Sequence, residues 1–129
     1  MTKGVIAIDE GMTALDAARI MTERGISSLI VEKEHVPIGI ISERDFVKKI
    51  CVKDILPSSI TVGTIMSKIQ TYASPDTTVD VAVQRMVNHK IRRLPIISEG
   101  KVVGIITVTD LAKHLRTILL IESILSPEI

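Results

Sequence analysis

The chain has 129 residues, of which 46% are hydrophobic and 24% charged, and its formal net charge is +1. These values predict one domain, or two small units that share a core, and they argue against a disordered chain. Near-neutral charge and only two aromatic residues, Phe46 and Tyr72, disfavour a nucleic-acid platform, and the apolar runs are too short to span a membrane. With no secretory pattern at the start and a single Cys51, which we expect to be at least half-buried, we expect a cytoplasmic protein.

The first half of the chain predicts the order strand, helix, strand, strand, helix. Apolar residues recur at helical spacing in the helices, and β-rich runs bounded by turn residues mark the strands. The expected segments are a strand over 4–8, a helix from Thr13 to a stop at Gly25, strands over 26–31 and 38–41 with a turn at 35–37, and a helix over 42–50.

The second half repeats this order after a connector that contains the breaker Pro57-Ser58-Ser59 and a helical turn over 62–66. We expect Thr77 to cap the next helix, with Asp80 completing a capping box. Its predicted apolar face consists of Val79, Ala82, Val83, Met86 and Val87. The other expected segments are strands over 71–73, 94–97 and 102–106, a hairpin turn over 99–101, and a helix from Thr107 to about 116.

The two halves are copies of one unit. At an offset of 65 residues, eleven of the 38 positions from 13 to 50 are identical without a single insertion, and the identities include Gly39/Gly104 and Asp45/Asp110. We therefore divide the chain into a first repeat over 1–56, a connector over 57–68, a second repeat over 69–116 and a helical tail over 117–129. The tail is so apolar that we expect the body or another subunit to cover it.

Each repeat contains one Ser/Thr-x-x-Asp turn where a strand ends and a helix begins: Ser42 with Asp45, and Thr107 with Asp110. The structural interpretation is a capping box at the first turn of the helix. The functional interpretation is an anion or ribose site, because a carboxylate can accept hydrogen bonds from both ribose hydroxyls. Both interpretations stay open, and the occurrence of the motif in both repeats favours function.

Arg92 and Arg93 precede a strand of the second repeat, where the first repeat has Ser27 and Ser28. They are either solvated cations near the C-terminal end of a helix or a phosphate clamp. A guanidinium group suits a clamp because it can donate two hydrogen bonds to one phosphate. The three histidines lack metal-ligand spacing, and no catalytic motif or constellation is present. We therefore expect neither a metal site nor an enzyme.

The repeat resembles a cystathionine-beta-synthase (CBS) domain in three stretches: Ser74-Pro75-Asp76-Thr77-Thr78-Val79, Ile91-Arg92-Arg93-Leu94-Pro95 and Gly104-Ile105-Ile106-Thr107-Val108-Thr109-Asp110. The whole chain is thus similar to a CBS pair, or Bateman module. The resemblance implies an α/β (α+β) fold of two β-α-β-β-α repeats, related by a pseudo-twofold axis and packed through their sheets, with a cleft on each side. It also implies a regulatory module that binds AMP, ADP, ATP or S-adenosylmethionine, needs no cofactor and commonly forms a homodimer.

By this resemblance, Asp45 and Asp110 hold ribose hydroxyls, and Thr107, Thr109 and Ser42 contact ribose or phosphate. Arg92 and Arg93 face phosphates, with Arg44 and Ser28 as further ligand-binding candidates. The adenine slots are lined by Ile6, Ile26, Thr71 and Ile91. We rank the Asp110 cleft first, because Arg44 replaces the hydroxyl of Thr109 and the first repeat lacks the short helix that usually precedes the opening strand.

The leading hypothesis is therefore a non-catalytic module that senses an adenosine ligand and signals to a separate, unidentified protein. The alternative is a dimerisation or protein-interaction module with unoccupied clefts, which the apolar tail favours and the retained pair of aspartates disfavours. Nucleic-acid binding through residues 89–93 ranks third, because the net charge and aromatic content are low.

Overall fold

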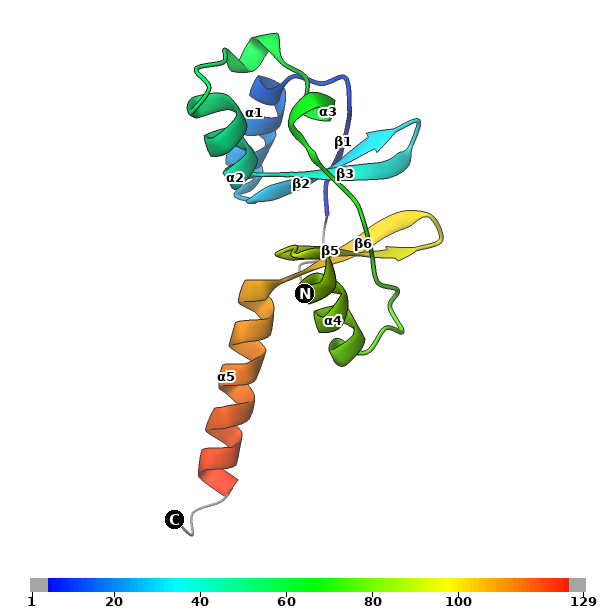
Figure 1. The fold of residues 1–129 in the computed structure, drawn as a ribbon, viewed down its shortest axis with the longest axis vertical. Helices are drawn as coiled ribbons and strands as arrows, with labels where there is room; N and C mark the ends of the chain where they lie inside the picture. The colour runs from blue at the N-terminus through cyan, green and yellow to red at the C-terminus, as the bar shows by residue number, and fades with distance from the viewer. Residues whose placement is uncertain (1–4, 126–129) are drawn as a thin grey trace.

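The computed structural model describes residues 5–125, and two stacked halves make up the body of the molecule, with their β-sheets facing each other (Figure 1). The first half contains β1 (Ala7–Asp9), α1 (Ala14–Arg24), β2 (Ser28–Lys33), β3 (Val36–Ser42) and α2 (Glu43–Phe46), which continues as a π-helical turn (Val47–Cys51). A 3-10 turn (Pro57–Ser59), α3 (Val62–Ile65) and β4 (Ser67–Lys68) follow. The second half contains α4 (Val79–His89), β5 (Arg93–Ser98), β6 (Lys101–Thr107) and α5 (Val108–Leu125).

The duplication predicted from the sequence is confirmed residue by residue in the secondary structure. The bounds of α4, β5 and β6 are those of α1, β2 and β3 shifted by 65 residues. The irregularity in strand pairing also recurs, after Val31 in the first repeat and after Ile96 in the second. The backbone has a positive φ at Glu34 and again at Glu99, so each hairpin turns with the same geometry.

The two sheets differ in size. In the first repeat the strand order is β1-β2-β3-β4, with β1 parallel to β2 and the other pairs antiparallel. In the second repeat β5 and β6 pair antiparallel, and the strand expected over 71–73 is reduced to one parallel bridge from Ala73. Pro75 explains the difference, because it has no N–H, whereas its counterpart Glu10 donates to the carbonyl of Glu32 at 2.9 Å.

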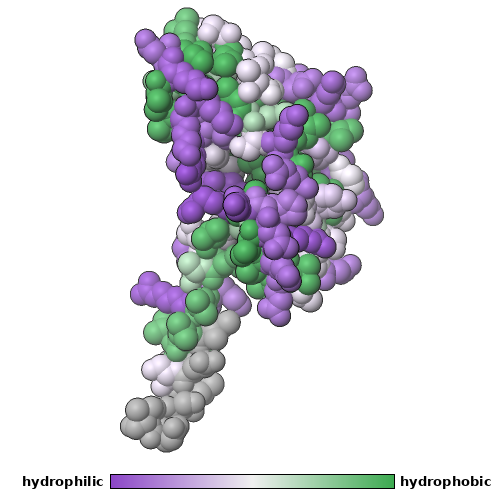
Figure 2. Space-filling model, in the orientation of Figure 1, coloured by the Kyte–Doolittle hydropathy of each residue, from purple (hydrophilic) through white to green (hydrophobic). Residues whose placement is uncertain are grey.

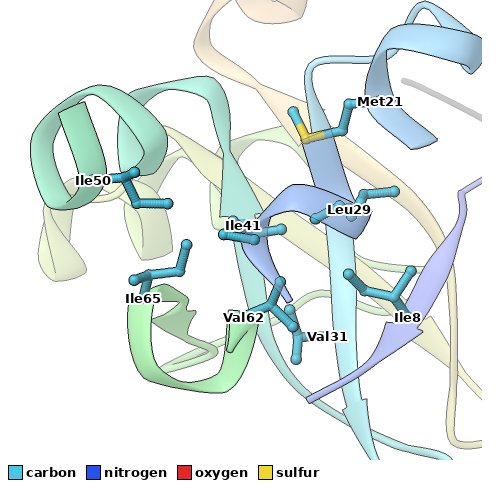
Figure 3. Packing of buried hydrophobic residues seen from close by; sticks show 10 residues of the cluster. Ile8, Met21, Leu29, Val31, Ile41, Ile50, Val62 and Ile65 are labelled. Carbon is cyan, nitrogen blue, oxygen red and sulfur yellow. The ribbon is translucent and has the colours of Figure 1, made fainter. Parts of the chain in front are cut away.

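Apolar side chains fill three clusters. The largest lies between the sheet and the helices of the first repeat (Figure 3), and it includes Ile8, Met21, Leu29, Val31, Ile41, Ile50, Val62 and Ile65. A smaller cluster in the second repeat contains Ala73, Ala82, Met86, Leu94 and Ile96. The third joins the two sheets through Ile30, Ile40 and Ile105. The repeats therefore pack through their sheets, as expected.

The helices of the second repeat are less covered than the sequence predicts. Of the five residues expected on the apolar face of α4, only Ala82 and Met86 are buried, and Val79, Val83 and Val87 are exposed. Helix α5 incorporates residues 117–125 of the predicted tail and extends away from the body (Figure 1). Its apolar side chains Leu115, Leu119, Leu120 and Ile121 are exposed, and hydrophobic atoms are visible on its first part in Figure 2. The body of this chain does not cover them.

Two smaller expectations were wrong. Thr78, not Thr77, caps α4, because its hydroxyl accepts from the N–H of Val81, while the hydroxyl of Thr77 accepts from Ser74 in the preceding turn. Cys51, the last residue of the π-helical turn, is exposed rather than buried. Among residues 5–125, no helical segment combines the length and the hydrophobicity that spanning a bilayer requires.

Candidate functional site

Two of the clefts that are lined by residues of both repeats contain predicted site residues. The first, which we call the Asp45 cleft, has a volume of about 290 Å³ and is lined by Ile40, Arg44, Asp45, Ser67, Lys68, Ile69, Gln70, Thr71, Lys90, Ile91, Arg92, Arg93 and Pro95. The second, the Thr107 cleft, has a volume of about 260 Å³ and is lined by Val5, Gly25, Ile26, Ser27, Ser28, Arg93, Ile105 and Thr107. Both volumes are near the lower end of the roughly 300–1,000 Å³ typical of small-molecule sites.

Repeat symmetry relates the two clefts. Six lining residues of the Thr107 cleft have their 65-residue counterparts in the Asp45 cleft: Val5/Gln70, Gly25/Lys90, Ile26/Ile91, Ser27/Arg92, Ser28/Arg93 and, in reverse, Ile105/Ile40. The backbone supports this equivalence, because the N–H of Glu43 donates to the carbonyl of Ser27 and the N–H of Val108 donates to that of Arg92. The helix that follows each Ser/Thr-x-x-Asp turn thus begins beside the start of a strand of its own repeat: α2 beside β2, and α5 beside β5.

The carboxylate of Asp45 holds together three segments of the first repeat. Oδ2 accepts from the N–H and the hydroxyl of Ser42 at 2.9 and 3.3 Å. Oδ1 lies 3.0 Å from Nζ of Lys49 and accepts from the hydroxyl of Ser67 at 3.3 Å. Lys49 also donates to the carbonyl of Ile65 at 2.7 Å. Asp45, only 7% exposed, therefore connects α2 to the segment that leads into the second repeat.

Gly39 allows this segment to approach β3. A Cβ atom at this position would collide with the side chain of Met66 and lie 3.0 Å from the carbonyl oxygen of Ser67. Since β4 pairs with β3 at Gly39 and Ile40, any side chain here would push Ser67 away from Asp45. Gly39 is therefore required for the close approach of β4 to β3.

The second motif has the expected capping-box geometry. The N–H of Thr107 donates to Oδ2 of Asp110 at 3.1 Å, and the N–H of Asp110 donates to the hydroxyl of Thr107 at 3.1 Å. Asp110 is half-buried, and it makes a further interaction beyond these two bonds. Thr107 lines its cleft directly, whereas Asp110 is not among the lining residues.

Positive charge distinguishes the Asp45 cleft. The cations that line it are Arg44, Lys68, Lys90, Arg92 and Arg93. Arg93 is also the only charged residue among those described around the Thr107 cleft. Its Nε atom is buried and has no hydrogen-bond partner. The arrangement offers bidentate guanidinium donors to an anion that enters the Asp45 cleft.

The structure groups the predicted site residues differently from the sequence-based ranking. Arg44, Asp45, Thr71, Ile91, Arg92 and Arg93 meet in the Asp45 cleft, and Ile26, Ser28 and Thr107 meet with Arg93 in the Thr107 cleft. Arg92 thus lies with the aspartate of the other repeat, not with Asp110. Four candidates line neither cleft: Ser42 bonds Asp45, Asp110 bonds Thr107, Thr109 is exposed on α5, and Ile6 packs against the first core cluster.

The sequence analysis did not identify several residues that line the Asp45 cleft. Ser67 and Lys68 lie in β4, which the sequence presented as connector, and Lys90 was noted only within a basic run. Repeat symmetry could have found Lys90, because its counterpart Gly25 precedes a predicted adenine-slot residue. It could not have found Ser67, because that contact depends on the path of the connector. Among the described residues, no cluster of three His, Cys, Asp or Glu side chains could hold a metal ion.

Comparison with known proteins places these features in a family. The family model of the CBS domain matches residues 1–52 and 62–117. The chain is 42% identical over 101 residues to an uncharacterised protein of Methanopyrus kandleri, a match that covers 77% of this chain and 52% of that protein. It is 31% identical over 119 residues to hypoxic response protein 1 of Mycobacterium tuberculosis, with 89% and 81% covered. The chain thus spans about half the length of the first relative.

A solved structure shows the same fold. The hexameric CBS-CP12 protein from bloom-forming cyanobacteria superimposes with a TM-score of 0.80 at 33% identity, over 87% of this chain and 63% of that one. The similarity extends over both repeats, which agrees with the family match to two segments of the chain.

Proposed function

This chain belongs to the CBS-domain family, as two such domains in tandem, and we propose that it is a non-catalytic regulatory module. It binds an adenosine-containing nucleotide in the Asp45 cleft and passes the occupancy to a separate partner protein. The observation that carries the proposal is the chemistry of one cleft, in which apolar side chains meet guanidinium groups and a carboxylate.

The apolar part of the cleft suits a purine. Its apolar lining comes from both repeats and consists of Ile40, Ile69, Ile91 and Pro95. A flat base that entered the cleft would therefore bury its faces against carbon atoms. Arg92 and Arg93 supply the donors for phosphate oxygens at the other part of the cleft. A base and a phosphate in one small cavity require a ribose between them, which brings its hydroxyls to Asp45.

Ribose binding at Asp45 has a structural consequence. A carboxylate has about four lone-pair positions, and the bonds from Ser42, Ser67 and Lys49 already use them. The 3.3 Å bond from Ser67 is long, so we expect a ribose hydroxyl to replace it first. Lys49 joins Asp45 to the carbonyl of Ile65, and a change at Asp45 therefore reaches α3 and β4. A sensor needs such a difference between its occupied and empty states.

Calorimetric titration with AMP, ADP, ATP and S-adenosylmethionine tests the proposal. Arg92→Ala removes an exposed side chain that makes no described contact, so the fold should persist while affinity for the bound nucleotide falls about 10- to 100-fold. Arg19→Ala is the matched control, because Arg19 is an exposed arginine on α1 that lines neither cleft. Absence of binding by all four compounds, or equal losses in both variants, would contradict adenosine sensing.

A second candidate function is dimerisation with the clefts empty. The exposed apolar side chains of α4 and α5 favour it, since a second copy of the chain would remove them from water. Light scattering after size exclusion, with and without residues 117–129, tests this function. A dimer that becomes a monomer after truncation places the contact on α5, and a monomeric full chain excludes the dimer.

A further inference from the structure

Five cations line the Asp45 cleft, far more than one phosphate requires. No described carboxylate forms an ion pair with any of these five cations, and Asp45, the only carboxylate among the described lining residues, is paired with Lys49. Like charges that converge in a cavity with apolar walls repel one another and produce a concentrated positive potential. Such a potential is relieved by a ligand that carries several negative charges close together.

The repeat comparison shows that three of these cations have uncharged counterparts in the first repeat. Where the second repeat has Lys90, Arg92 and Arg93, the first has Gly25, Ser27 and Ser28. Lys90 is notable for its backbone, because it holds a left-handed conformation with φ of 53°, which glycine adopts at the equivalent Gly25 with φ of 62°. Lysine at a position that favours glycine costs stability.

Arg93 provides an independent observation. Its Nε atom is buried without a hydrogen-bond partner, although buried donors in proteins are nearly always satisfied. The side chain lines both clefts, so it can direct its donors into either one. Because Nε is buried, a phosphate in the Asp45 cleft reaches it only when the side chain turns toward that ligand, and the guanidinium is then unavailable to a ligand in the Thr107 cleft.

We infer that the Asp45 cleft recognises a chain of two or three linked phosphates, and that each protein chain binds one such ligand. The choice among adenosine ligands rests on the proposed function. Recognition of linked phosphates then favours ADP and ATP over AMP, which has one phosphate, and over S-adenosylmethionine, which has none and carries a sulfonium cation. The recognition of linked phosphates depends only on the five cations. The stoichiometry of one ligand per chain follows from Arg93, because this one side chain lines both clefts.

The test is a titration with ATP, ADP, AMP, S-adenosylmethionine and inorganic tripolyphosphate in the presence of EDTA. We expect affinity to rise about tenfold or more for each added phosphate, as charge-assisted hydrogen bonds accumulate. Tripolyphosphate should bind and displace ATP, with one site per chain, and affinity should fall steeply with added salt. AMP or S-adenosylmethionine binding as tightly as ATP, or two equal ATP sites per chain, would overturn the inference.

The outcomes separate this inference from the proposed function. If AMP and ATP bind equally and tripolyphosphate does not compete, adenosine sensing stands and the phosphate-chain inference fails. If GTP, added to the same titration, and tripolyphosphate both bind as tightly as ATP, the phosphate-chain inference stands and adenosine recognition fails. If none binds, both fail.

Lys90→Gly separates binding from folding. Because glycine relieves the left-handed strain, we expect the melting temperature to rise by roughly 3 to 5 °C while ATP affinity falls about tenfold. Glu99→Gly is the matched control: Glu99 has the same φ of 53° in the hairpin between β5 and β6 and lines neither cleft. It should stabilise the protein and leave affinity unchanged. A Lys90→Gly protein that binds ATP like the wild type would contradict the assignment.

Discussion

The two repeats share the bounds of one helix and two strands but not the same interior. Ile50 is 3% exposed, whereas its counterpart Leu115 is 56% exposed, and Ala14 is fully buried where Val79 is 54% exposed. The cause is the chain that follows each repeat. After the first, residues 60–66 return over α1, where the N–H of Ala14 donates to Ile60 and that of Val62 to Met12. After the second, α5 continues straight. Equal local structure therefore does not produce an equal core.

The largest effect is expected from shortening the side chains at two equivalent positions, one in each repeat. Ile50→Ala should cost about 2–5 kcal/mol of unfolding free energy, because it leaves a cavity in the main core. Leu115→Ala should change it by no more than about 0.5 kcal/mol, because water already surrounds the side chain. Urea unfolding measures both. Equal losses that vary with protein concentration would instead show that a second copy covers α5 in solution.

The two aspartates offer the next contrast, in binding. Asp45→Asn keeps the shape of the side chain but weakens its bonds to ribose hydroxyls, so the ratio of ATP affinity to tripolyphosphate affinity should fall about tenfold. Loss of a negative charge should raise the affinity for both ATP and tripolyphosphate, and this common gain cancels in the ratio. Asp110→Asn, the equivalent change, should leave the ratio unaltered, because Asp110 does not line the Asp45 cleft. The opposite result would restore the Asp110 cleft to first place.

The last contrast comes from exchanging the residues at the start of the two first helices. Ala14→Val adds carbon atoms to a site without space and should destabilise the protein by about 1–3 kcal/mol. Val79→Ala should be neutral or stabilise by up to about 0.5 kcal/mol, because alanine favours a helix and little packing is lost. Thermal unfolding checks both signs. A clear loss from Val79→Ala would mean that α4 is covered in the assembled protein.

Much of the fold and part of the site could be predicted from residue order. Helix and strand periods, the stop at Gly25 and the hairpin turns are determined by neighbouring residues, and the eleven identities at one offset made the duplication visible. The capping boxes of Ser42 and Thr107 are equally local, since donor and acceptor are three residues apart. For the same reason, the sequence could not distinguish a cap from a ligand site.

What the tertiary structure decided is which residues meet across the repeats. The sequence placed Arg92 and Asp110 in one unit, and the packing of sheet against sheet brought Arg92 to Asp45 instead. The path of the connector placed Ser67 against Asp45, and it buried Ala14 while leaving Val79 exposed. Neighbours in the chain determine helices, strands and turns, because those depend on short-range bonds. Burial and the composition of a cleft depend on contacts between distant segments, and these exist only once the two repeats have packed together.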